Sequence, residues 1–551
     1  MKSFFAKIII FLFLFLVASS ANGTRHEDFF QCLSTHISNP TSTHEPIIHT
    51  PNDNNSSYST LLTSSIHNHR FSTPSTPKPT AIITPSHASH IQATVFCSKE
   101  HGVQIRIRSG GHDYEGLSYT SYNNKKNVTS LFVVIDLRHL SSISVDVESQ
   151  SAWVQTGATL GQLYYRIAEK SENLAFPAGD CHTVGMGGQI GGGGYGYLTR
   201  KHGLAADNVL DAEIIDAQGR ILDRKSMGED LFWAIRGGGA ASFGIVLAWK
   251  VRLVPVPSKV TVLSVWRNME HVATKKFLHR WQRNAHKVDE DLSIYITFVT
   301  ASYVDEQGNK KIVVEANVRG TFHGAMDRFL ELMQEEFPEL GLQRQECHEM
   351  RWVESFRFFN LFGNDESLDV LLSRKSNYNL MSFKVKSDYV KEPIPDDVFE
   401  AMLGRLYEIE VGRAYVYLFP YGGKVNEISE SAIPLPYRAG NLYMLHYIVR
   451  WEEEEEEEKH LSWIRGLYNY MTPYVSKNPR ATYLNFRDLD IGMNDNDGNT
   501  TSMEEAAIWG SKYFNNNFNR LVHVKSIVDP TNIFTHEQSI PPLLTHVYSS
   551  I

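Results

Sequence analysis

The sequence predicts a mixed α+β protein, because strand-like and helix-like segments alternate along a chain of ordinary globular composition. The chain has 551 residues, of which 42% are hydrophobic and 21% are charged. A chain of this composition is too apolar to stay disordered and long enough to bury a large core. Its net charge of −9 argues against a nucleic-acid partner, whose phosphates attract Lys and Arg.

The predicted elements begin near residue 80. Apolar alternation predicts strands at 80–85, 103–108, 131–137 and 152–155, and helical spacing predicts helices at 89–100 and 160–170. A strand–turn–strand at 214–222 and a β-rich segment at 243–256 follow. After a proline-marked boundary, we expect strands at 293–300, 311–318, 414–420 and 442–451, and a helix at 325–337. Seven consecutive glutamates at 452–458 are typical of the solvated first turn of a helix.

Residues 1–23 have the three parts of a secretory signal peptide: a basic start, a short apolar run and small residues near the end. The apolar run is near 10 residues, whereas a membrane span needs about 20. We therefore expect entry into the secretory pathway, with the extracellular space (apoplast) or the vacuole as destination, and no membrane anchor. The sequons at Asn54, Asn55, Asn127 and Asn499 then become candidate glycan sites.

Secretion also permits disulfides. Cys32 and Cys97 flank a stretch rich in Pro, Ser, Thr, Asn and His, and a bridge between them would hold the N-terminal segment against the body. Cys347 is expected to be a free thiol.

Two glycine-rich segments predict a ligand cradle. The segment 185–196 has eight glycines in twelve positions and apolar flanks, which lets backbone approach a large planar or phosphorylated ligand. Gly191, Gly193 and Gly196 also match G-x-G-x-x-G, but no strand precedes them, so we reject a dinucleotide-binding βαβ unit. The segment 108–116 follows a predicted strand directly, and its Ser and Gly N–H groups could form an anion nest.

Four segments carry a family resemblance: 108–119, 176–184, 224–233 and 513–541. They resemble the plant berberine bridge enzyme-like family of flavin-linked oxidases, and 438–440, 471–476 and 487–490 are similar to the cannabinoid-acid synthases within it. The resemblance implies a two-lobed FAD-binding fold of the vanillyl-alcohol-oxidase (PCMH) type with a substrate domain made of a sheet plus helices. It divides the chain into an N-terminal segment (24–75), an FAD-binding domain (76–256), a substrate domain (257–480) and a C-terminal segment that returns to the FAD domain (481–551).

The resemblance also implies FAD bound bicovalently, through His112 to the 8α-methyl and through Cys181 to C6. Val184, three residues after this cysteine, is similar to the valine of relatives that react well with oxygen. No metal is implied. The expected FAD contacts are Arg108, Ser109, Gly110, Gly111, His112, Asp113, Tyr114, Cys181, Val184, Gly187, Gly188, Tyr195, Gly196, Ile245 and Asn532.

The chain departs from the family pattern at several positions. His182 stands where the family has proline, Gln189 where it has histidine, and Phe486 where it generally has the tyrosine held to be the catalytic base. Phenylalanine cannot accept a proton. We expect His446 to be a candidate base in the strand 443–447, where Met444 is its neighbour on the same face.

Other side chains complete the expected substrate pocket. Lys386 is expected to lower the pKa of a phenol by its charge. Phe486, Met444, Tyr443, Tyr417 and Phe419 are expected to line the pocket.

The resemblance predicts a secreted plant oxidase or oxidative cyclase of specialised metabolism. It would oxidise a phenolic, prenylated or alkaloid substrate by hydride transfer to FAD and be reoxidised by O₂ to give H₂O₂. Because Phe486 removes the usual base, a redox-neutral cyclase of the Diels–Alderase type stays open, since such a reaction needs orientation rather than a base. A carbohydrate oxidase or an inactive ligand-binding relative is the further alternative, and a monomer is expected.

Overall fold

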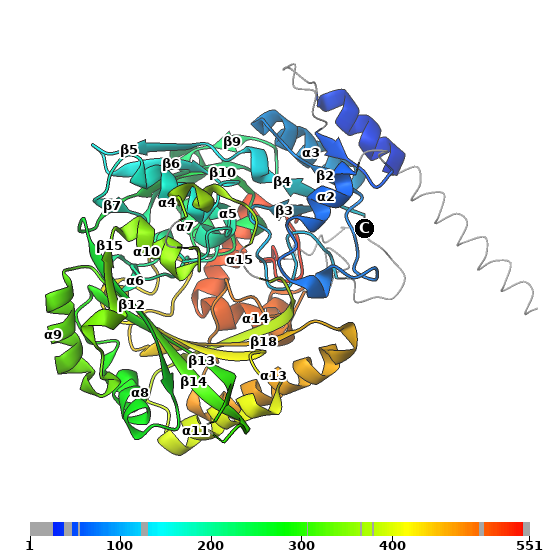
Figure 1. Ribbon diagram of the computed structural model, residues 1–551. Coiled ribbons are helices and arrows are strands. Elements are labelled where there is room, and N and C mark those ends of the chain that lie inside the picture. The colour runs from blue at the N-terminus through cyan, green and yellow to red at the C-terminus, as the bar shows by residue number, and fades with distance from the viewer. Residues whose placement is uncertain are drawn as a thin grey trace, which may run out of the picture.

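The structure, a computed structural model, describes residues 26–37, 47–52, 56–122, 131–305, 307–363, 366–376, 379–494 and 501–543. The expected leader and the four sequons lie outside these residues. Helices and three larger sheets form the described part, so the α+β class is confirmed (Figure 1).

The first sheet has the strand order β1-β2-β4-β3. Its strands are β1 (Ile48–His49), β2 (Ala81–Ile83), β3 (Gln104–Arg108) and β4 (Phe132–Asp136). β2 and β3 run parallel to the central β4, whose five residues are all buried, as expected of a strand covered on both faces. The helices α2 (Ser57–Thr63) and α3 (Ala88–His101) lie beside this sheet, and α3 ends at Gly102 in the left-handed conformation.

The second sheet is antiparallel, with the order β5-β6-β10-β8-β9. Its strands are β5 (Ile143–Asp146), β6 (Ser151–Gln155), β8 (Val209–Ile215), β9 (Ile221–Leu222) and β10 (Ile245–Arg252). β7 (Leu174–Ala175) and β11 (Val254–Pro255) form a short pair beside it. The associated helices are α4 (Leu160–Ala168), α5 (Met186–Gly191), α6 (Thr199–His202) and α7 (Arg224–Ile235).

The third sheet has seven antiparallel strands in the order β15-β12-β14-β13-β17-β18-β16. Its strands are β12 (Val260–Asn268), β13 (Leu292–Val304), β14 (Lys310–Phe322), β15 (Cys347–Met350), β16 (Ser382–Val390), β17 (Ala414–Pro420) and β18 (Tyr443–Trp451). Helices cover its outer face, in the lower half of Figure 1. They are α8 (Val272–Asn284), α9 (Met326–Glu336), α11 (Asp396–Gly404) and α13 (Glu457–Met471).

Alternation along β18 divides its side chains between two cores. Tyr443, Leu445 and Tyr447 pack among the outer helices, whereas Met444 packs in a core shared with the second sheet. The inner face of the third sheet is therefore turned toward the first half of the chain. The smaller helices α10 (Trp352–Phe359) and α12 (Lys424–Glu427) contribute buried side chains to the same core as Met444.

The C-terminal part returns across the molecule. α14 (Met503–Phe514) and α15 (Asn517–Val528) lie in red between the upper sheets and the third sheet in Figure 1. The C-terminal residues Phe534 and Ile540 are buried in cores made mainly by the first half of the chain.

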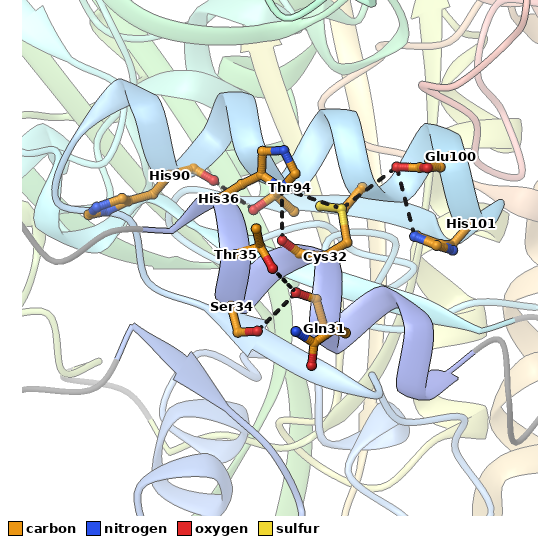
Figure 2. Close-up of a disulfide and its surroundings, with 10 residues drawn as sticks. Gln31, Cys32, Ser34, Thr35, His36, His90, Thr94, Glu100 and His101 are labelled. Atoms are coloured by element: carbon orange, nitrogen blue, oxygen red, sulfur yellow. Dashed lines mark hydrogen bonds and ion pairs between the residues drawn. A yellow bond between two sulfur atoms is a disulfide. The ribbon is translucent and has the colours of Figure 1, made fainter.

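The N-terminal segment is fastened by a disulfide. Cys32, on the helix formed by residues 26–36, is bonded to Cys97 of α3, which confirms the predicted pairing (Figure 2). Cys347 is a buried free thiol, and burial raises its pKa to about 11.

The glutamate run also lies as expected. Glu452 to Glu455 are exposed, and α13 begins at Glu457 after a 3₁₀ turn at Glu454–Glu456. Among the described residues, no helix is both long and apolar enough to cross a membrane.

Candidate active site

A cleft of about 320 Å³ lies where the first two sheets, the inner face of the third sheet and the C-terminal return meet. Twelve of the fifteen expected cofactor residues line it. They are Ser109, Gly110, Gly111, His112, Asp113, Tyr114, Cys181, Val184, Gly187, Gly188, Tyr195 and Gly196. The two glycine-rich segments thus meet at one site, although they lie about 80 residues apart.

The loop after β3 forms one wall of the cleft. Gly111 has φ +76°, and a Cβ at this position would lie 2.2 Å from the carbonyl oxygen of Ser65, so only glycine fits. Asp113 holds the next turn, since its carboxylate accepts from the N–H groups of Glu115 and Leu117 at 3.0 and 3.2 Å. It also pairs with Arg487 from the C-terminal return at 2.9 Å.

The second glycine-rich segment forms the facing wall. It contains the six-residue helix α5, which follows Gly185 and not a strand, in line with the rejected dinucleotide fold. A Cβ on Gly188 would meet no atom within 4 Å, and Gly188 is exposed although it lines the cleft. The backbone here is open for a ligand to lie directly against it.

His112 and Cys181 meet at the hydroxyl of Thr183. The His112 Nε2 lies 2.8 Å and the Cys181 Sγ 3.6 Å from Thr183 Oγ1. Burial, with the neighbouring His67 stacked at 3.7 Å, keeps the pKa of His112 well below its usual range, and burial raises the pKa of the Cys181 thiol. A neutral imidazole and a neutral thiol therefore lie side by side in the cleft wall.

Three expected cofactor residues are placed elsewhere. Arg108 forms a buried ion pair with Asp136 at 2.7 Å and is a structural residue behind the loop. Ile245 packs in the core of the first sheet, because its neighbours Gly244 and Val246 take the cleft-facing positions. Asn532 lies in the turn after α15, where its N–H donates to Asp529. None of these three residues is among those that line the cleft, so their expected contact with FAD stays a prediction.

Aromatic side chains form the remaining wall. Tyr295 and Phe419 meet edge to face at 5.0 Å, and Tyr195 lies 5.9 Å from Tyr295. Phe486 continues this wall and stacks on the ring of His446 at 3.9 Å with an interplanar angle of 9°. Tyr195 is fixed because its hydroxyl donates to the carbonyl oxygen of Pro420.

His446 lies behind Phe486 and not at the cleft surface. Burial, then the charge of Arg450, lowers its pKa to about 3. Its Nε2 has no hydrogen-bond partner among the described residues. A neutral imidazole with so low a pKa is a weak proton acceptor at neutral pH.

The placements expected for Tyr443 and Lys386 are wrong. Tyr443 points to the outer side of the third sheet, where its hydroxyl donates to Gln282 Oε1 at 2.7 Å. Lys386 lies on the outer side too, because it pairs in register with Tyr447, and it forms ion pairs with Asp488 at 2.7 Å and Asp490 at 2.8 Å. Its charge is therefore already compensated and is not offered to a substrate.

Some lining residues received no role from the sequence. Asp180, Tyr295 and Asn485 line the cleft. The alternation of side chains along β13 is a sequence signal that could have identified Tyr295 as a lining residue. For Asp180, the signal is that it directly precedes Cys181. His182, by contrast, is buried away from the cleft between Asn360 Oδ1 and the carbonyl oxygen of Lys375, each at 3.1 Å.

The residues present fit a flavin nucleotide. At Gly188 the wall leaves open space where a Cβ would project, and backbone N–H groups of glycine-rich turns of this kind suit a pyrophosphate. The neutral His112 and Cys181 stand together next to an aromatic wall that suits a planar ring.

Comparisons with known proteins agree with this site. Residues 79–224 match the family described as FAD binding domain, and residues 482–541 match the family described as berberine and berberine like. Tetrahydroberberine oxidase of Berberis wilsoniae is 51% identical over 98% of both chains. Cannabidiolic acid synthase-like 1 of Cannabis sativa is 48% identical over 97% of both chains.

Solved structures share the fold. Berberine bridge enzyme-like protein 28 of Arabidopsis thaliana is 47% identical, with a TM-score of 0.84 over 94% of this chain and 100% of its own. The grass pollen allergen Phl p 4, described as having glucose dehydrogenase activity, is 40% identical with a TM-score of 0.86 over the same shares. Sequence matches along nearly the whole chain and the two-lobed FAD-binding fold of these neighbours place the protein in the berberine bridge enzyme-like family of FAD-dependent oxidoreductases.

Proposed function

We propose that the protein is a secreted plant oxidase that carries FAD bicovalently on His112 and Cys181 and oxidises a phenolic, prenylated or alkaloid small molecule. The observation that carries the proposal is the meeting of His112 and Cys181 at one hydroxyl, beside an aromatic cavity wall. When bound, FAD supplies the hydride acceptor, and O₂ takes the electrons to give H₂O₂.

The chain's own groups hold and orient the reactants. The loop 109–114 and the glycines of 185–196 hold the cofactor, and two covalent links would keep it in a cleft that stays open to large substrates. Tyr295, Phe419 and Phe486 offer ring faces and edges against which an aromatic substrate can stack. The relative named tetrahydroberberine oxidase supports an alkaloid, and the cannabidiolic acid synthase-like relatives support a prenylated phenol.

The attachment is tested on purified protein by acid precipitation. A yellow pellet that retains its flavin in the wild type, and in the single variants His112→Ala and Cys181→Ala, supports two links. The double variant should release the flavin into the supernatant. Flavin that leaves the wild-type pellet contradicts the bicovalent assignment.

The reaction is tested by anaerobic mixing with candidate phenols and with tetrahydroberberine while the flavin absorbance is followed. Bleaching of the flavin, with H₂O₂ release after O₂ is admitted, supports an oxidase. Turnover without bleaching or O₂ consumption supports the second candidate, a redox-neutral cyclase.

Phe486 and His446 favour that second candidate. A phenyl ring stacked on an imidazole of low basicity leaves this part of the cavity without a strong proton acceptor, and a cycloaddition needs none. Carbohydrate oxidation is the remaining alternative, supported by the glucose dehydrogenase activity in the description of the pollen allergen. We also propose that the protein is a monomer of the extracellular space or vacuole.

A further inference from the structure

Asp180 is a carboxylate of the cleft without a structural task. It precedes Cys181, lines the cleft, and also borders a second recess of about 20 Å³ behind it. Its side chain is exposed where it lines the cleft, and burial of its surroundings is nevertheless the largest influence on its pKa, which it raises. No other side chain of the described residues donates a hydrogen bond to this carboxylate or pairs with it.

The backbone around Asp180 is held firmly. Its carbonyl oxygen accepts from Asn360 Nδ2 at 2.6 Å, and the preceding carbonyl, of Gly179, accepts from the Tyr164 hydroxyl at 2.9 Å. The side chain is thus placed by its neighbours while its oxygens remain unused. A carboxylate that lines a cleft with a shifted pKa and no partner among the described side chains is typical of a group kept for ligand chemistry.

We propose that Asp180 accepts the proton that a phenolic substrate loses during oxidation, in place of the tyrosine expected at position 486. This inference rests on the proposed oxidase function. It deepens that function by naming the base and a substrate class with an ionisable hydroxyl on an aromatic ring.

The surroundings of Asp180 suit this task. Burial raises its pKa above the ordinary value, while the charge of Arg319 on β14 opposes the rise without forming an ion pair. A carboxylate with a raised pKa is a stronger base than an exposed one and remains a proton acceptor near neutral pH. The titratable and charged groups that face it are Tyr114, Tyr164, Cys181, Tyr295, Arg319 and Tyr417.

The reaction balances for 4-hydroxybenzyl alcohol. The benzylic carbon gives up a hydride to FAD, and the phenolic O–H bond breaks as its proton passes to an Asp180 carboxylate oxygen. The substrate loses two electrons and becomes a quinone methide, which tautomerises to 4-hydroxybenzaldehyde. O₂ reoxidises the flavin to give H₂O₂, and Asp180 returns its proton to water.

The first test follows flavin reduction by 4-hydroxybenzyl alcohol in the absence of O₂ across the acid to neutral range. The wild-type rate should rise with pH through the raised pKa of Asp180. Asp180→Asn should be roughly 100-fold slower, since a general base contributes about that factor to the rate. It should also lose the rise of the rate with pH, here called the acid limb of the pH profile. Asp180→Glu should restore part of the rate and the limb. Glu172→Gln, which removes an exposed carboxylate paired with Arg351 at 3.5 Å, is the control and should behave as the wild type.

The second test measures binding and does not depend on turnover. Phenol has no benzylic hydrogen to transfer, and anisole lacks the phenolic proton. Phenol should perturb the flavin spectrum of the wild type with an affinity that rises with pH, and Asp180→Asn should bind it roughly tenfold more weakly at neutral pH, as expected for loss of a hydrogen bond to a charged group. Anisole binding should be equal in the two proteins.

The outcomes separate the two proposals. A wild type that bleaches with 4-hydroxybenzyl alcohol, alongside an Asp180→Asn variant with the same rate and pH limb, overturns the role of Asp180 alone. A wild type that bleaches with none of the candidate substrates contradicts the oxidase function, and the binding test then still decides whether Asp180 recognises a phenolic proton. Equal binding of phenol to wild type and variant overturns the inference.

Discussion

At the scale of single residues, burial decides which groups of the site can carry charge. His446 and His112 have pKa values below the ordinary range because burial disfavours their charged forms and nearby basic groups act in the same direction, whereas burial raises the pKa of Asp180 and Cys181. The cleft wall therefore holds the neutral His112 and a neutral thiol, with the neutral His446 behind Phe486. Of its two carboxylates, Asp113 pairs with Arg487, whereas Asp180 has no ion-pair partner among the described residues. A histidine in the right strand is not automatically a base, since its surroundings set its protonation.

His446→Phe should stabilise the protein in acid but not in alkali. The unfolded chain protonates this histidine below about pH 6.5, whereas the folded protein resists protonation until about pH 3. The folded state consequently loses stability as the pH falls through this window, by about 2 kcal/mol at pH 5. Thermal unfolding of wild type and variant at pH 5 and pH 8 measures the difference. An equal shift of Tm at both pH values would contradict the assigned pKa, and stacking on Phe486 should persist in the variant.

Val184→Ile should slow the reaction with O₂. Val184 is half-buried and lines the cleft, so an added methylene narrows the space next to the expected flavin ring. We expect reoxidation to slow by roughly tenfold, which corresponds to about 1.4 kcal/mol of barrier, with little change in the rate of flavin reduction. Stopped-flow mixing of reduced protein with O₂ measures the first rate, and anaerobic reduction provides the control. Slowing of both rates alike would point to a general disturbance of the site.

At the scale of elements, period-two and helical patterns predicted the strands and helices well but not the direction of every side chain. β17 has the same bounds as its prediction, and β18 agrees to within one residue. Along β18, however, Tyr443 and Met444 necessarily face opposite sides, so they could not both line the pocket. The direction of Lys386 could not be predicted from the strand pattern either. Its side chain is held by ion-pair partners from a loop about 100 residues later.

The glycine-rich segments and the motif residues were more predictable, because close backbone approach leaves a mark in the sequence itself. Gly111 is needed for its positive φ and for the close contact with Ser65. Asp180 left no such mark. Its importance depends on which groups of β13, β14 and β17 surround it, and only the three-dimensional arrangement supplies these neighbours.

Removing the disulfide should release one element and leave the cleft intact. The bond between Cys32 and Cys97 closes a loop with a sequence separation of 65 and fastens helix 26–36 to α3. The double variant Cys32→Ser/Cys97→Ser should lose about 2–4 kcal/mol of stability and become sensitive to proteolysis before residue 47, while it retains its flavin. Cys347→Ala, which removes a buried unpaired thiol, is the matched control and should leave this segment protected. Unchanged proteolysis of the double variant would show that packing alone holds the helix.

At the scale of the whole molecule, a buried set of ion pairs joins the parts of the chain that form the site. Lys384 of β16 pairs with Glu115 from the loop after β3 and with Asp488 from the C-terminal return, the latter at 2.8 Å. Arg106 of β3 pairs with Glu537 at 2.9 Å. The nearby lysines lower the pKa of Asp488, so its contribution to stability is present above its ordinary pKa of about 3.8 and is lost as the pH falls below that value.

Lys384→Met should therefore weaken the connection between the two halves more than it weakens either half. Lys384 is only 3% exposed, and its removal leaves Glu115 and Asp488 buried with less compensation, which should cost about 3–5 kcal/mol. Calorimetry should show a lower Tm and a transition that separates into two steps, since each half retains its own core. Lys275→Met removes an exposed lysine paired with Glu400 at 2.8 Å and should shift Tm little. A single transition with the wild-type Tm in Lys384→Met would show that apolar packing, and not the buried ion pairs, holds the two halves in the register that builds the cleft.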